Sequence, residues 1–267
     1  MSTTRSCATR LAPPATPKAS PTSLPARSHR WKPSLRRCRP PAACDRSGRR
    51  RRTGWIAVVL DDRLEPDARH LPTIDALGPL ATQAAAITID NPIGLPSESA
   101  READLLAREF VGARRSSVFV TPVREAIEAR THALATRAAF DRTGAGISQQ
   151  AYALGRKIVE VEQWLPSSPC PVYEVNHEVS FAVLLGSPAR ASKKTWAGMV
   201  ERRRALETAG ISPERVDDEA AVRASVDDML DAAVAAWSAA RIARGAARSF
   251  PDPPRLGADG KRVAIWA

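Results

Sequence analysis

Acidic residues at three separated places in the chain have the chemistry of divalent-metal ligands. Asp90 stands at the end of an apolar run in ITIDNPIGLP, Glu174 and Glu178 lie in YEVNHEVSF, and Asp228 and Asp231 lie in VDDMLDAAVAAW. Mg²⁺ needs hard oxygen ligands and is usually bound by one or two carboxylates plus water and substrate phosphates. One acid from each place could therefore hold Mg²⁺ or Mn²⁺. Two such ions would activate water and stabilise the leaving oxygen of a phosphodiester.

Each of these acids also has a structural interpretation. Asp90 could simply form the turn that follows the apolar run. Asp228 interrupts an alanine face of a predicted helix, with Asp231 close by. Acids near a helix start also suit the helix dipole while remaining in water. His177, between the two glutamates, is either a base beside a metal or a structural histidine.

The elements that must position these residues indicate a mixed α/β domain. Apolar runs predict buried strands in TGWIAVVL and AAAITID, a third strand in CPVYEV that runs on into a helix, and a closing strand in KRVAIWA. The segment HLPTIDALGPL is ambiguous and could hold an edge strand. Helices are predicted over residues 97–112 with Ser97 or Ser99 as cap, after Pro122, and over 148–165, 195–208 and 217–244. If YEVNHEVSF is extended, Glu174, Asn176 and Glu178 share one face.

The positive charge of the chain is confined to its first residues. The 267 residues carry a formal net charge of +11. Residues 1–54 hold 14 of the 40 basic residues and one acid, Asp45, and so carry +13, whereas the remainder holds 26 basic and 28 acidic residues and carries −2. A near-neutral body gives no general attraction for a polyanion. Residues 1–53, rich in arginine and proline, are predicted to be a disordered tail: a basic arm, a targeting peptide, or an artefact of a wrong start site or reading frame.

Other common chemistries lack their sequence signatures. The chain has no CxxC pair, no GxxxxGK[ST], no GxSxG and no HExxH. No apolar run is long enough to span a bilayer, so we expect a cytoplasmic protein without membrane contact. Arg115 and Ser116 could grip a backbone phosphate, as could Lys193 and Lys194, although solvated loops are an equal alternative.

The motifs in their order along the chain resemble the domain-of-unknown-function 429 family. The series is TGWIAVVL, IDNPIGLP, RRSSVF, ISQQAYALGRKIVEV, YEVNHEVSFA, SKKTWAG, VDDMLDAAVAAW and IWA, from about Thr53 to Ala267. The resemblance implies a ribonuclease H-like domain over residues 54–267, a mixed central sheet flanked by helices, and a predicted nuclease activity. That activity is inferred from fold, which does not by itself establish function.

The resemblance also assigns residues. Asp90 matches the family's aspartate before Pro-Ile-Gly, Glu174 and Glu178 match its Glu-Val-His-Pro-Glu segment with Asn-His in place of His-Pro, and Asp228 and Asp231 match its acidic pair on the last helix. These five acids and Lys194 are the predicted catalytic residues. The predicted metal ligands are Asp90, Glu174, Asp228 and Asp231, and the predicted phosphate contacts are Arg115, Ser116 and Lys193.

One position departs from the family pattern. The family usually opens with a Gly-Val-Asp strand whose aspartate is the first metal ligand of the fold, and counting back from Trp55 reaches Arg49 instead. An arginine cannot bind a metal, so we expect metal-dependent hydrolysis and stability to be impaired in this chain. The sequence thus leaves two functions: a Mg²⁺- or Mn²⁺-dependent nuclease acting on DNA or RNA, and a non-catalytic protein of the same fold that binds a ligand or partner in the same cleft. It indicates no oligomeric state.

Overall fold

The computed structural model describes residues 54–267 except 213–219, 221, 223 and 258–259. The predicted disordered tail, residues 1–53, and Arg49 with it, lie outside the described residues. The strands are β1 (Trp55–Leu60), β2 (Pro66–Leu71), β3 (Ile87–Ile89), β4 (Val172–Val175), β5 (Ser249–Leu256) and β6 (Arg262–Trp266). The α-helices are α1 (Gly78–Ala81), α2 (Glu102–Phe110), α3 (Arg124–Glu128), α4 (His132–Thr143), α5 (Gln149–Trp164), α6 (His177–Leu185), α7 (Trp196–Thr208) and α9 (Val226–Ala243). Short 3-10 turns are η1 (Ile74–Leu77), η2 (Gly112–Ser117) and η3 (Leu165–Ser167).

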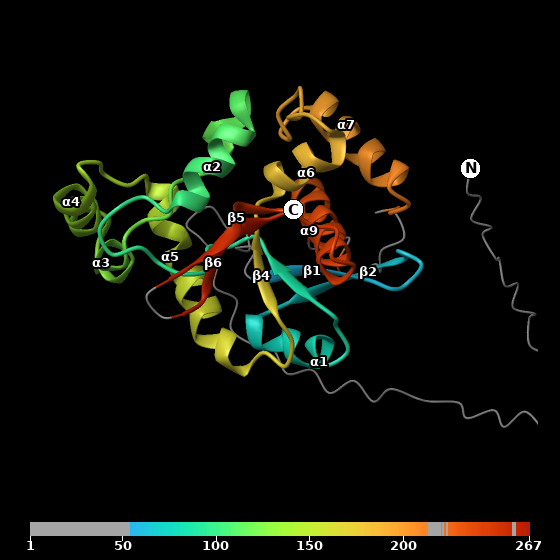
Figure 1. Ribbon diagram of the computed structural model, residues 1–267, viewed down its shortest axis with the longest axis horizontal. Helices are drawn as coiled ribbons and strands as arrows, with labels where there is room; N and C mark the ends of the chain where they lie inside the picture. The colour runs from blue at the N-terminus through green and yellow to red at the C-terminus, as the bar shows by residue number, and fades with distance from the viewer. Residues whose placement is uncertain (1–53, 213–219, 221, 223, 258–259) are drawn as a thin grey trace, which may run out of the picture. The chain divides into compact units, whose positions relative to one another are not determined.

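A mixed sheet of four strands, flanked by helices, forms the centre of this α/β domain (Figure 1). Its strand order is β3-β4-β6-β5, with β3 parallel to β4, β4 parallel to β6, and β5 antiparallel to β6. Because β3 and β4 are parallel, their carboxyl ends lie at the same edge of the sheet. Side chains that follow these two strands are therefore neighbours in space, although more than 80 residues separate them in sequence.

Strand β3 lies between two helices. Ile87 and Ile89 are buried and pack with Val161 and Trp164 of α5. Thr88 points the other way, and its hydroxyl donates a hydrogen bond to the carbonyl oxygen of Ala235 in α9 at 2.7 Å. Successive side chains of a strand alternate between faces, so one short strand contacts both helices. The prediction of a buried strand is confirmed for Ile87 and Ile89, whereas Thr88 on the other face is half-buried.

Strands β1 and β2 form an antiparallel pair apart from the main sheet. The register runs from Trp55 opposite Leu71 to Leu60 opposite Pro66, and α9 lies along β1. Among the described residues β1 pairs only with β2. It is half-buried, with Val59 38% exposed, so our prediction of a fully buried strand is wrong. A strand in a two-stranded sheet lacks the neighbours that would cover it on both sides.

Two further apolar clusters fix the helices that surround the sheet. Phe181 of α6 packs with Leu206 of α7 and with Leu230 and Val234 of α9. Alanine side chains join α3 and α4 in a separate cluster, and Tyr152 of α5 packs against it. The first of these clusters holds α6 and α9 side by side at the carboxyl edge of the sheet, where the predicted acids lie.

Several predicted boundaries differ from the structure. The helix predicted over 97–112 begins at Glu102, with Arg101 as its N-cap residue and no side-chain cap, so neither Ser97 nor Ser99 caps it. The helix predicted from 217 begins at Val226 after the cap Ser225, and residues 217–219 lie outside the described part.

Strand β5 has no counterpart in the sequence prediction. It contains three prolines, which argue against a strand, but it lies at the edge of the sheet, where a missing N–H is tolerated. No helix in the described part of the chain has both the length and the apolar character to cross a membrane.

Candidate metal centre

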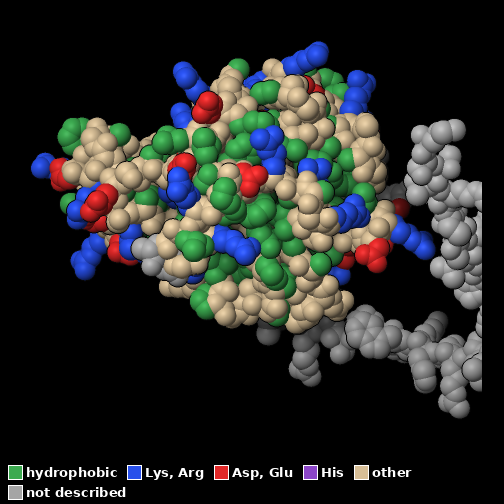
Figure 2. All heavy atoms as spheres, in the orientation of Figure 1, with side chains coloured by type: hydrophobic (Ala, Val, Ile, Leu, Met, Phe, Trp, Pro, Cys, Tyr) green, Lys and Arg blue, Asp and Glu red, His purple; other side chains and the backbone are tan. Residues whose placement is uncertain are grey.

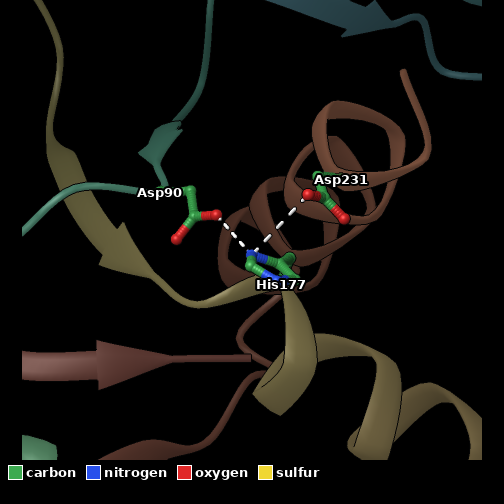
Figure 3. Close-up of side chains that lie close together, drawn as sticks. All are labelled: Asp90, His177 and Asp231. Atoms are coloured by element: carbon green, nitrogen blue, oxygen red, sulfur yellow. Dashed lines mark hydrogen bonds and ion pairs between the residues drawn. The ribbon is translucent and has the colours of Figure 1, made fainter. Parts of the chain in front are cut away.

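Three elements bring Asp90, His177 and Asp231 together at the carboxyl edge of the sheet (Figure 3). Asp90 is the residue after β3. His177 is the first residue of α6, which begins two residues after β4 ends. Asp231 lies in the second turn of α9, the helix that packs against both β3 and α6. The convergence follows from the parallel pairing of β3 with β4 and from the packing of α9 across them.

The side chains of this cluster face one another at separations that a shared ion could bridge. Nδ1 of His177 lies 2.6 Å from Oδ2 of Asp90 and 3.8 Å from Oδ2 of Asp231. One ligand atom from each of the three residues can be chosen so that all lie within 4.8 Å of one another. Two carboxylates and an imidazole in this arrangement can share a divalent ion.

A lysine from the segment before α7 closes the cluster. The ammonium group of Lys193 forms an ion pair with Oδ2 of Asp231 and lies 3.1 Å from Nε2 of His177. A lysine ammonium only donates hydrogen bonds, so Nε2 accepts here and Nδ1 carries the proton that is donated to Asp90. The imidazole is thus oriented by a carboxylate on one side and a cation on the other.

Burial and charge shift the protonation of the cluster in identifiable ways. Burial alone would lower the pKa of His177, but the carboxylates of Asp90 and Asp231 raise it above its usual value. Burial raises the pKa of Asp231, and the charges of His177 and Lys193 offset this only in part. Oδ1 of Asp231 is buried with no hydrogen-bond partner. A buried carboxylate oxygen without a partner is costly, and a bound cation would remove that cost.

Glu174, a predicted metal ligand, is held by a buried arginine. Both of its carboxylate oxygens accept hydrogen bonds from Arg101, at 2.6 and 2.7 Å, and one also accepts from the backbone N–H of Ile93 at 2.7 Å. Arg101 also pairs with Asp104. Burial alone would lower the pKa of Arg101, but its two acidic partners raise it. Glu174 therefore lies outside the cluster, and its role as a ligand stays a prediction that this geometry does not favour.

Glu178 lies in a helix and not on a strand face. Strand β4 ends at Val175, and the side chain of Asn176 caps α6 by accepting from the backbone N–H groups of Glu178 and Val179. Our expectation that Glu174, Asn176 and Glu178 share one strand face is therefore wrong. Both oxygens of Glu178 accept from Arg202 at 2.8 Å, and both side chains are buried.

The two acids in the first turn of α9, Asp227 and Asp228, form different interactions. Asp228 forms a capping box with Ser225, so it stabilises the helix end and is not part of the cluster. Asp227 forms an ion pair with Lys194. Burial acts to raise the pKa of Asp227, but Lys194 and Ser225 lower it to about 2. Of the predicted ligands, the structure thus brings together Asp90 and Asp231 and leaves Asp228 one turn away.

The predicted phosphate contacts Arg115 and Ser116 are exposed in η2. The neighbouring Arg114 donates hydrogen bonds to the carbonyl oxygens of Ala189 and Arg190, at 2.9 and 2.6 Å. These bonds join η2 to the segment between α6 and α7, which also carries Lys193. The structure therefore links the predicted phosphate contacts through one pair of loops.

Sequence reasoning considered His177 as a base or a structural residue and did not place it among the metal ligands. Its position directly after a helix-capping asparagine at the end of a parallel strand was the available signal. Nothing in the sequence pointed to Arg101 and Arg202 as partners of the two glutamates, because 73 and 24 residues separate the members of these pairs.

The chain belongs to the family described as "Protein of unknown function (DUF429)", whose sequence model matches residues 44–256. This confirms the family that the motifs indicated, and the match begins nine residues before Thr53. No curated protein and no solved structure matches the chain significantly.

Proposed function

We propose that this protein is a metal-dependent hydrolase of phosphodiester bonds in nucleic acid, with a ribonuclease H-like form of the mixed α/β fold. The observation that supports this most strongly is the convergence of Asp90, His177 and Asp231 within 4.8 Å at the carboxyl edge of parallel strands. Ligands of open α/β sheets bind at that edge.

The chemistry of the three residues fits a divalent cation. The unpartnered, buried Oδ1 of Asp231 is a donor atom in need of a positive partner. Mg²⁺ prefers ligand sets made of oxygen alone, whereas imidazole suits first-row transition metals, the series to which Mn²⁺ belongs. Of the two ions predicted from the sequence, Mn²⁺ therefore suits this set better. A bound cation would supply Lewis-acid stabilisation and lower the pKa of a bound water.

Asp90 would orient His177, and the two lysines would orient the substrate. Asp90 fixes the ring of His177 through the 2.6 Å contact to Nδ1. Lys193 neutralises Asp231 and places its ammonium group at the cluster, where it could contact a phosphate oxygen. Lys194, one residue further on, is largely exposed and remains a candidate for a second phosphate contact.

A basic rim beside the cluster favours a phosphate-containing substrate. We define the basic rim as Arg114, Arg115, Arg190, Lys193 and Lys194, which lie in two joined segments, residues 112–120 and 186–195, that contain no acidic residue. Within the described part of the chain, no ion pair is found for Arg115 or Arg190. On the face seen in Figure 2, basic and acidic side chains are mixed. The rim is therefore a local feature of a near-neutral body.

A second candidate function is non-catalytic ligand binding in the same cleft. It is favoured by Lys193, whose ammonium group already neutralises Asp231 and lies against His177 where a cation would be expected. In that case the cleft would need no metal to balance its charge.

Calorimetric titration with Mn²⁺ tests the proposed metal centre. Asp231→Asn and Asp90→Asn each remove one carboxylate charge with little change in shape. We expect each to weaken Mn²⁺ binding by at least about tenfold, because even outer-shell partners of metal sites contribute 10- to 100-fold. Wild-type protein that binds no Mn²⁺ would favour the non-catalytic alternative.

Asp228→Asn is the matched control for this titration. It lies on the same helix, one turn before Asp231, and asparagine can preserve the capping hydrogen bond with Ser225. We expect it to leave Mn²⁺ binding unchanged. If all three variants bind Mn²⁺ like the wild type, the proposed centre is wrong. Cleavage of labelled RNA and DNA oligonucleotides with Mn²⁺ then tests hydrolysis itself.

A further inference from the structure

A small pocket lies beside the cluster at the same edge of the sheet. It is lined by the residues that follow β3, by the end of β4, by the start of α2, by Ile265 of β6, and by Val118, Phe119 and Thr121. Asp90 lines this pocket and also belongs to the metal cluster. A group in the pocket would therefore lie next to whatever the cluster binds.

The charge balance of the pocket disfavours an anion. The cation in its lining is Arg101, and both Glu174 and Asp104 already pair with that guanidinium. These three side chains together carry one negative charge, to which Asp90 adds another. A phosphate would be repelled here, whereas a neutral group that forms hydrogen bonds would not.

Thr121 lines this pocket and has an unused hydrogen-bonding group. The residue is 2% exposed, its backbone N–H donates to Oδ2 of Asp104 at 2.7 Å, and its hydroxyl Oγ1 is buried with no partner. The side-chain amide of Asn91, also buried and in the lining, makes one long hydrogen bond, 3.4 Å to the carbonyl oxygen of Pro92. Buried polar groups are normally satisfied, so a partner from outside the chain is indicated.

We propose that the pocket receives a ribose 2′-hydroxyl of the substrate through Thr121, and that the preferred substrate is therefore RNA. This inference rests on the proposed nucleic-acid hydrolase function. In a nucleic acid the 2′-hydroxyl is the neutral donor and acceptor closest to the backbone phosphate, and DNA lacks it. A substrate without the hydroxyl would leave the Thr121 group unpaired, which is how a polar site rejects such an analogue.

The test compares RNA and DNA oligonucleotides of the same sequence as substrates for the full chain in Mn²⁺. We expect the wild type to cleave RNA at least about tenfold faster. Thr121→Val removes the hydroxyl and keeps the shape, and should remove that preference by slowing RNA cleavage while DNA cleavage stays unchanged. Thr82→Val, an exposed threonine before β3 at the opposite end of that strand, is the matched control. Equal rates on RNA and DNA in the wild type, or equal losses on both in Thr121→Val, would overturn the proposal.

A binding measurement separates this proposal from the hydrolase proposal. If neither oligonucleotide is cleaved, fluorescence anisotropy of the same two oligonucleotides gives their affinities. An RNA preference that Thr121→Val abolishes supports the pocket and contradicts the hydrolase function. Absence of binding, or binding without that preference, overturns the pocket.

A thermal melt of Thr121→Val tests a purely structural role for the hydroxyl. Replacing an unpartnered buried hydroxyl by a methyl group should leave Tm unchanged or raise it. A fall in Tm of several degrees with the RNA preference retained would show that the hydroxyl serves the fold, and would also overturn the proposal.

Discussion

At the scale of residues, the charged side chains of the metal cluster shift one another's pKa values. His177 lies between Asp90 and Asp231, whose charges outweigh the effect of burial, so its pKa is raised. Lys193 acts against this shift from the other side of the ring. When it is protonated, the imidazole takes part of the role of a cation between the two carboxylates.

We predict that His177 stabilises the metal-free protein most at low pH. A histidine whose folded pKa exceeds its unfolded value, about 6.5, contributes stability that is complete below that value. The contribution is lost as pH rises through the folded pKa, at about 1.4 kcal/mol for each unit of pKa difference. The measurement is a series of thermal melts of wild type and His177→Gln in a chelator, between about pH 5 and 8, the range in which histidines titrate. The difference in Tm in favour of the wild type should shrink as pH rises.

Asp90, the ion-pair partner of His177, provides the control for this pH dependence. Asp90→Asn removes a neighbouring carboxylate that raises the pKa of His177, so the NMR titration of the His177 ring should move to lower pH. The His177→Gln spectrum assigns the signal. An unchanged titration in Asp90→Asn would contradict the ion pair.

At the scale of elements, the sequence predicted those features that short-range chemistry determines. Thr195 caps α7 and Ser148 caps α5, and both helices occupy nearly the predicted residues. Asp90 was placed correctly after a buried strand, because the apolar run before it is also a local signal. The fates of Glu174 and Glu178 depended instead on arginines that only the folded chain brings near, and no local pattern contains that information.

The close approach of α7 to the segment that carries Lys193 also depends on contacts formed only in the folded chain. Arg202 of α7 donates to the carbonyl oxygen of Ala191 and pairs with Glu178 of α6. A Cβ atom on Gly198 would lie 2.0 Å from the backbone oxygen of Ser192. Only glycine permits this contact, which fixes the segment over the cluster.

We predict that Gly198→Ala destabilises the protein by about 1–3 kcal/mol, because overpacking against backbone forces α7 and residues 191–195 apart. Urea unfolding measures the change. Gly78→Ala is the matched control, since nothing lies within 4 Å of an added Cβ there and its backbone is helical. A Gly198→Ala variant as stable as the wild type would contradict the close approach.

At the scale of the whole molecule, the charge is divided between two parts of the chain. Residues 1–54 carry +13 and the rest carry −2, so a nucleic acid would be attracted to the body only where cations gather locally. The basic rim is such a place, and it borders the cluster. The total charge of the chain is therefore no guide to this site, because residues 1–54 could by themselves dominate nonspecific binding of nucleic acid.

The salt dependence of binding distinguishes the rim from that background. Each phosphate contact on a single strand contributes a slope of about 0.7 to the dependence of log Kd on log salt concentration. We predict that Arg115→Gln in the full chain lowers this slope for a single-stranded oligonucleotide by about 0.7, measured by anisotropy over a salt series. Arg137→Gln removes another exposed arginine, in α4, which Figure 1 shows apart from α6 and α7, and should leave the slope unchanged. Equal slopes for both variants would mean that the rim does not contact the phosphates and that the charge of the first segment accounts for binding.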